Sequence, residues 1–85
     1  MKWDVVKVVP QDNMTLSVLF KDGLKGRVRF LESHLTGVFV PLKDPAVFSQ
    51  VFVNHGAVTW SDGEIDLAPD AMYEEIKKHG EWVLK

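Results

Sequence analysis

The segment MTLSVLFKDGLKGRVRF, residues 14–30, decides the fold, because apolar and polar residues alternate on both sides of residues 21–23. This alternation is typical of two antiparallel strands that bury one face. A two-residue loop would set Phe20 opposite Lys25 and would mix the two faces. A three-residue loop instead sets Phe20 opposite Leu24 and keeps the apolar residues together. We therefore predict a hairpin with the longer loop, closed by a glycine in the left-handed conformation.

A second hairpin is predicted where residues 57–60 and 64–67 flank Asp62-Gly63. Asp-Gly is among the strongest signals for a two-residue hairpin loop. That loop pairs Trp60 with Ile65 and keeps the apolar side chains on one face. We also expect Trp60 to lie inside the core.

The first strand is predicted over residues 5–9, which are β-branched at nearly every position and are followed by Pro10. Valines occupy both faces of this segment. We therefore expect a central strand, or one that is covered on both sides, followed by a turn at residues 10–13.

The middle of the chain is expected to consist of short pieces: a helical turn over residues 31–35 and a loop that extends to Pro41. Asp44-Pro45 combines a capping residue with a proline at the first helical position, which predicts a short helix over residues 46–50. Residues 51–53 are then predicted to form a strand.

The last helix is predicted over residues 70–79, opened by Pro69 and ended by Gly80. One buried stripe is predicted at helical spacing from Met72, Tyr73, Ile76 and His79. The apolar tail, residues 81–85, is expected to pack on the sheet or to pair at its edge.

Length and composition limit the class of protein. The chain has 85 residues, 46% of them hydrophobic, with no cysteine and a net charge of −2. We expect a single domain over residues 1–85, soluble and cytoplasmic, since no apolar run could span a membrane. The predicted fold class is α+β: an antiparallel β-meander of five to six strands, with a short central helix and a C-terminal helix packed on the sheet.

Motifs for chemistry are absent from the sequence. The three histidines, at positions 34, 55 and 79, lie far apart and have no cysteine to complete a metal site. The acidic run 62–66 lacks the later glycine and glutamate of a calcium-binding loop. We therefore expect no catalytic residue, no metal and no cofactor, and we do not expect an enzyme.

Charge is distributed unevenly, with bases more frequent in residues 1–30 and acids more frequent in residues 61–85. We call the candidate partner-binding residues the acidic set: Glu64, Asp66, Asp70, Glu74 and Glu75. We call the candidate residues for contact with nucleic acid or an acidic partner the basic set: Lys21, Lys25, Arg27 and Arg29. Each set could also be a solvated surface with no function.

Several segments together resemble the small bacterial domain-of-unknown-function family 2442. They are PLKDPAVF at 41–48, VFV at 51–53 and VTWSDGEIDLAPDAMY at 58–73, and the turn FKDG at 20–23 is also similar. The resemblance covers nearly the whole chain. It implies a meander with a C-terminal helix and no established catalytic residues. It also implies a gene context in which such domains often lie beside another small protein in a toxin–antitoxin-like pair.

The leading hypothesis is a non-enzymatic protein-binding module that uses the acidic set, such as an antitoxin-like partner of a small basic protein encoded nearby. The alternative is a weak nucleic-acid-binding or regulatory module that uses the basic set. The net charge of −2 and the lack of a helix-turn-helix segment speak against tight binding of nucleic acid. A homodimer that forms through an exposed edge strand is also open.

Overall fold

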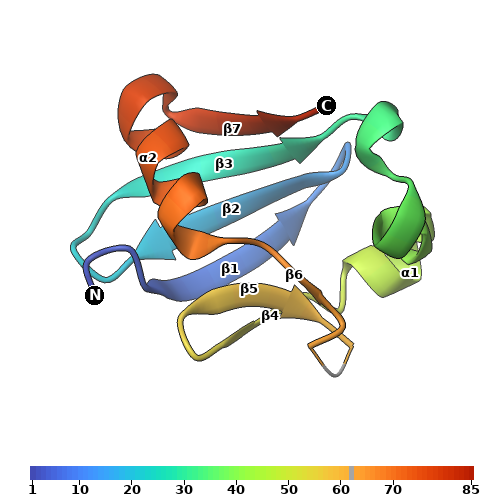
Figure 1. Ribbon diagram of the computed structural model, residues 1–85, viewed down its shortest axis with the longest axis horizontal. Coiled ribbons are helices and arrows are strands. Elements are labelled where there is room, and N and C mark those ends of the chain that lie inside the picture. Colours follow the sequence, from blue (N-terminus) through green and yellow to red (C-terminus); the bar gives the residue numbers. More distant parts are fainter. Residues whose placement is uncertain (62) are drawn as a thin grey trace.

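The computed structural model describes residues 1–61 and 63–85, which form two β-sheets with helices around them (Figure 1). The first, sheet A, has the strand order β1-β2-β3-β7, and the second, sheet B, has the order β4-β5-β6. The strands of sheet A are β1 Val5–Gln11, β2 Thr15–Phe20, β3 Lys25–Phe30 and β7 Glu81–Leu84. Those of sheet B are β4 Phe52–Asn54, β5 Ala57–Trp60 and β6 Ile65–Asp66.

The helices connect the sheets and confirm the predicted α+β class. Two short 3-10 helices, η1 Glu32–His34 and η2 Gly37–Lys43, follow β3. The short central helix is α1 Pro45–Phe48, and the C-terminal helix is α2 Pro69–His79. Most strand pairs are antiparallel, but β3 and β7 are parallel. The chain returns to sheet A only after it has formed sheet B and α2.

The first hairpin has the predicted register. Leu16 pairs with Val28, and the Phe20 backbone N–H donates to the Leu24 carbonyl at 2.8 Å. Gly23 has φ +95°, the left-handed conformation that the three-residue loop needs. The apolar alternation therefore determined the loop length, because a shorter loop would have put Phe20 opposite a lysine.

The second hairpin also has the predicted pairing. Trp60 pairs with Ile65, and the Leu67 backbone N–H donates to the Val58 carbonyl at 3.0 Å. Asp62, at the tip of the predicted two-residue loop, lies outside the described residues.

The core lies between one face of sheet A and a cover formed by sheet B, α1 and α2. Trp60 is fully buried, as predicted, and its indole Nε1 donates to the Phe48 carbonyl at 2.9 Å. Phe30 lies against both of these rings, at centroid distances of 5.9 Å from Trp60 and 5.8 Å from Phe48. Helix α2 crosses in front of sheet A (Figure 1), where Tyr73 packs edge-on against Phe20 at 5.1 Å.

The first strand corrects the prediction of a central or doubly covered strand. β1 is at the edge of sheet A, and Val6 and Val9 are 54% and 41% exposed. The register shifts between Val5 and Lys7, which places a bulge at Val6. The strand also continues through Pro10, which an edge strand tolerates. Valines on both faces therefore did not mean burial on both faces.

Three further segments can be compared with their predictions. His79 is exposed and is not part of the buried stripe, because α2 ends one residue later, where Gly80 adopts φ +77°. The loop predicted as far as Pro41 is helical, since it lies within η2. The tail does pair at a sheet edge, as β7. In the described part of the chain, no helix is long and apolar enough to cross a membrane.

Candidate functional site

The two faces of sheet A differ in what covers them. On β3, Val28 and Phe30 are buried toward the core, while the alternate residues are exposed on the other side. No described helix or strand covers that other side, which we call the open face. From β1 and β2 it contains Lys7, Val9, Gln11, Thr15, Ser17 and Leu19. From β3 and β7 it contains Lys25, Arg27, Arg29, Glu81 and Val83.

Strand register places bases from separate strands on the same side of sheet A. Lys7 of β1 pairs with Leu19 of β2, which in turn pairs with Lys25 of β3. Neighbouring strands lie roughly 5 Å apart, so the two lysines flank Leu19 from strands about 10 Å apart. Lys7 was not part of the basic set, because the register of β1 could not be derived from a segment with valines on both faces.

A shallow hollow lies between these bases, over the short side chain of Ser17. Its volume is about 220 Å³. Ser17 lies in the centre of the sheet and carries too short a side chain to fill the space between its neighbours on β1 and β3. The other residues that line the hollow are Lys7, Val9, Val18, Leu19 and Lys25. The open face therefore has an aliphatic and hydroxyl-bearing centre between the bases of β1 and β3.

One base of the open face is paired. The Arg29 Nε lies 3.5 Å from the Glu81 Oε1, and both side chains are partly exposed. Lys7, Lys25 and Arg27 form no ion pair with any described residue. Their charges are therefore available to a partner in solution.

The basic set is brought together only in part. Lys25, Arg27 and Arg29 share the open face, but Lys21 lies in the loop that joins β2 to β3. The Lys21 backbone N–H donates to the Asp4 carbonyl at 2.8 Å, which fixes that loop at the end of the sheet.

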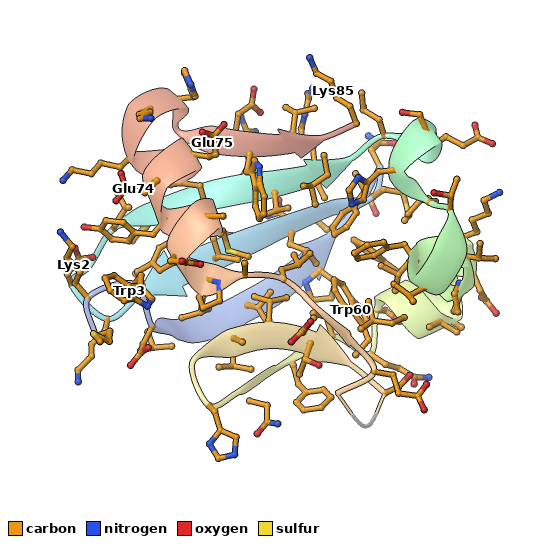
Figure 2. All side chains as sticks on the ribbon, viewed as in Figure 1. Lys2, Trp3, Trp60, Glu74, Glu75 and Lys85 are labelled. Carbon is orange, nitrogen blue, oxygen red and sulfur yellow. The ribbon has the colours of Figure 1, made fainter. Side chains whose placement is uncertain are left out.

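The acidic set is spread over several surfaces. Glu64 and Asp66 belong to the second hairpin, whereas Asp70, Glu74 and Glu75 belong to α2. Figure 2 shows Glu74 and Glu75 on different sides of the helix, with Glu75 toward β7. On α2 two exposed bases, Lys77 and Lys78, follow the acids in the last turn. The structure does not gather these five carboxylates into one patch.

A hydrogen bond ties α2 to the first hairpin. The Tyr73 hydroxyl donates to the Asp22 Oδ2 at 2.5 Å. This bond, aided by the Leu24 backbone N–H, holds the pKa of Asp22 below its ordinary value of 3.8. The same bond raises the pKa of Tyr73, because ionisation of the phenol would remove the proton that it donates to the carboxylate. Sequence spacing gave no sign of this contact between residues 51 positions apart.

The His34 side chain is held by contacts with other parts of the chain. Nδ1 of His34 lies 3.2 Å from the Lys85 carbonyl, and its ring packs against Phe39 at 4.7 Å. Among residues 1–61 and 63–85, no three histidine or carboxylate side chains could hold a metal ion together.

Comparison with known proteins places the chain in a family. The family model described as "Protein of unknown function (DUF2442)" matches residues 5–78. No curated protein matches the chain, and no solved structure matches it. The matched range includes β1 to β6 and nearly all of α2, so the match covers both hairpins and the helix that packs on sheet A. The chain therefore belongs to the DUF2442 family.

Proposed function

We propose that this chain is a non-enzymatic protein-binding module that uses the open face of sheet A to bind a partner with an acidic surface. One observation carries the proposal: strand register sets the unpaired bases Lys7, Lys25 and Arg27 around an uncovered aliphatic centre. A partner that carries carboxylates around a small apolar patch would complement this surface in charge and in polarity.

The composition of the open face favours a protein over a nucleic acid. Sheets that bind single-stranded nucleic acid stack the bases on aromatic side chains. The described residues of the open face include no aromatic side chain, and its centre is formed by Val9, Ser17 and Leu19.

The expected energetics follow from exposure. Exposed charges increase the rate of association more than they strengthen the complex, and salt screens them. Burial of Val9 and Leu19 would supply the part of the affinity that does not depend on salt. We therefore expect an association rate that falls with salt and a dissociation rate that changes little.

The partner of this proposal is acidic, which differs from the basic partner expected from the sequence. The acidic set is spread over α2 and the second hairpin, whereas the bases of β1 and β3 share one face. That the partner is a small protein encoded nearby, in an antitoxin-like pairing, remains a prediction from the family resemblance.

The first experiment locates the binding of an acidic partner. ¹⁵N-labelled protein is titrated with a synthetic peptide of alternating glutamate and leucine residues, and the backbone amide shifts are followed. We expect the shifts to cluster on β1, β2 and β3 and to shrink as salt is added. Shifts that cluster on α2 and β6 instead would contradict the proposal.

Two charge-matched variants separate a specific face from a general effect of charge. Lys25→Glu/Arg27→Glu reverses two bases of the open face, and Lys43→Glu/Lys77→Glu reverses two exposed bases outside it. The first variant should lose the peptide, and the second should keep it. If both variants lose binding equally, only net charge matters. Wild type and the same two variants then serve as baits in a pull-down. The partner is the acidic protein that Lys25→Glu/Arg27→Glu fails to capture and that the other two baits retain.

The alternative of nucleic-acid contact is tested in parallel with a single-stranded oligothymidine. Binding of the oligonucleotide with a steep salt dependence, lost in Lys25→Glu/Arg27→Glu and without binding of the peptide, would replace the protein-binding proposal. If neither probe shifts the amides of the open face and no bait captures an acidic protein, this face is a solvated surface.

A further inference from the structure

Strand β7 leaves one edge of sheet A open. The Arg27 backbone N–H donates to the Gly80 carbonyl, and the Leu31 N–H donates to the Leu84 carbonyl. In a parallel pair, alternate residues of a strand bond to the same neighbour. The backbone N–H and C=O groups of Glu81 and Val83 therefore point away from β3, where no described strand accepts them.

The opposite edge of sheet A is partly closed. The Val5 backbone N–H of β1 donates to the Gly56 carbonyl at 2.8 Å, so the turn between β4 and β5 occupies that position. Strand β7 is four residues long, and no described segment pairs with its outer edge. Sheet A can therefore be extended by another strand along the whole of β7.

We propose that two copies of this chain pair through β7 in antiparallel orientation, about a two-fold axis at Val83. In this register the Val83 residues of the two copies exchange both backbone hydrogen bonds. Glu81 then lies directly opposite Lys85 of the second copy, and symmetry creates this pair twice. Trp82, which is half-buried, lies opposite Leu84 of the second copy on the core side.

Charge selects this register over its neighbours. A parallel pairing in register would set Glu81 against Glu81 and Lys85 against Lys85, and like charges directly opposite destabilise a pair of strands. A two-residue shift of the antiparallel register in either direction would set Glu81 or Lys85 opposite Val83, and the two charged residues would no longer face each other. The opposite charges four residues apart on β7 are thus self-complementary only about Val83.

The elements beside β7 reinforce the same orientation. The end of α2, with Lys78, precedes the start of β7, whereas η1, with Glu32, lies at its far end through the contact between His34 and Lys85. A two-fold axis at Val83 brings the α2 end of one copy toward η1 of the other. The end of α2 carries the base Lys78 and η1 carries the acid Glu32, so elements of opposite charge meet at each end of the interface.

The dimer would join two four-stranded sheets into one continuous sheet. Both open faces would then lie on the same side, because the two-fold axis is perpendicular to the sheet. Each dimer would present two basic faces to one partner or to two, which would raise the apparent affinity for a partner with repeated acidic surfaces.

The test measures the mass of the 85-residue chain by sedimentation over a range of concentrations and at low salt. Wild type should form a dimer. Lys85→Glu leaves glutamate at positions 81 and 85, and Glu81→Lys leaves lysine at both, so each variant alone should raise the dimer dissociation constant about tenfold or more. Mixing the two variants should restore a dimer, because each chain then meets the opposite charges.

A backbone variant tests the hydrogen bonds. The Val83 N–H faces the open edge, so Val83→Pro removes two bonds between copies and none to β3. It should be monomeric, with a circular dichroism spectrum like that of wild type. A wild-type chain that stays monomeric up to about 1 mM would overturn the proposal. So would a mixture of charge variants that associates no better than its components, which keeps the test decisive if Val83→Pro fails to fold.

Discussion

Replacing Gly26 with alanine tests how closely α2 packs on sheet A. Gly26 is on the core side of β3, directly beneath the helix. A Cβ added there would lie 2.3 Å from Cγ2 and 3.0 Å from Cγ1 of Ile76, and 2.9 Å from the Gly80 carbonyl oxygen. Ordinary contacts between carbon atoms are about 3.5–4.0 Å, so either the side chain or the helix must move.

The size of the effect follows from these contacts. Ile76 is only 2% exposed, so it has little free space into which it can turn. Overpacking of this kind costs about 1–3 kcal/mol, and alanine recovers roughly 0.5–1 kcal/mol relative to glycine in a strand. We expect Gly26→Ala to lower the free energy of unfolding by about 1–2 kcal/mol, or the melting temperature by about 4–16 °C.

A double-mutant cycle with Ile76→Ala isolates the cause. Ile76→Ala alone should cost about 2–5 kcal/mol, because it leaves a cavity under α2. In the double variant the new methyl group occupies part of that cavity, so the combined loss should fall short of the sum by at least about 1 kcal/mol. Urea unfolding followed by tryptophan fluorescence measures all four proteins.

A glycine elsewhere supplies the control. Gly23 has φ +95° and no atom within 4 Å of an added Cβ, so Gly23→Ala introduces backbone strain without a clash. It should cost about 1–2 kcal/mol and should be additive with Ile76→Ala. If Gly26→Ala is neutral, or is additive with Ile76→Ala to within about 0.5 kcal/mol, the close approach of α2 is not the reason for glycine here.

Three further predictions concern single contacts. Trp60→Phe should lower the free energy of unfolding in urea by about 2–4 kcal/mol, since it leaves a cavity and the Phe48 carbonyl loses its donor; a loss below about 1 kcal/mol would refute this. Asp22→Asn should make the melting temperature fall less on acidification than it does in wild type. The pKa of Asp22 is held below 3.8, chiefly by the Tyr73 hydroxyl, so its stabilising effect is present above the unfolded-state pKa and is lost as the pH falls through the lower folded value. Identical losses of melting temperature for both proteins on acidification would refute it. His55→Asn should raise the free energy of unfolding by up to about 1 kcal/mol, and with it the melting temperature, because His55 has φ +51° and Asn favours that conformation in a turn before Gly56. An unchanged or lower melting temperature would contradict this.

Local features of the fold could be predicted from the sequence. Apolar alternation determined both hairpin registers, because a one-residue slip would have exposed every apolar side chain. Asp44 caps α1 by accepting from the Ala46 N–H at 2.9 Å, as its place before Pro45 predicted. Gly80 ends α2 as predicted. Each of these signals lies within a few residues of the structure that it specifies.

Long-range features could not be predicted from the sequence in the same way. The tail was expected to pack on the sheet or to pair at its edge, but its partner, β3, and the parallel direction depend on how α2 returns over sheet A. The place of β1 at the edge depends on the strands that pair beside it, and its valine pattern fits either position.

The candidate site likewise has a part that the sequence predicts and a part that depends on long-range structure. Lys25, Arg27 and Arg29 share a face because side chains alternate along a single strand, which the sequence shows directly. The addition of Lys7 requires the β1–β2 register, and the dispersal of the acidic set requires the orientation of α2.

The parallel pairing of β3 with β7 has a consequence for the order of folding. Arg27 and its partner Glu81 are separated by most of the chain, so this contact has a high loop-closure cost and forms late. The first hairpin can close while the ribosome is still making later segments, but the outer edge of β3 stays unpaired until residue 81 has emerged. A nascent chain therefore exposes a template for aggregation during synthesis, and completion of sheet A must follow translation of β7.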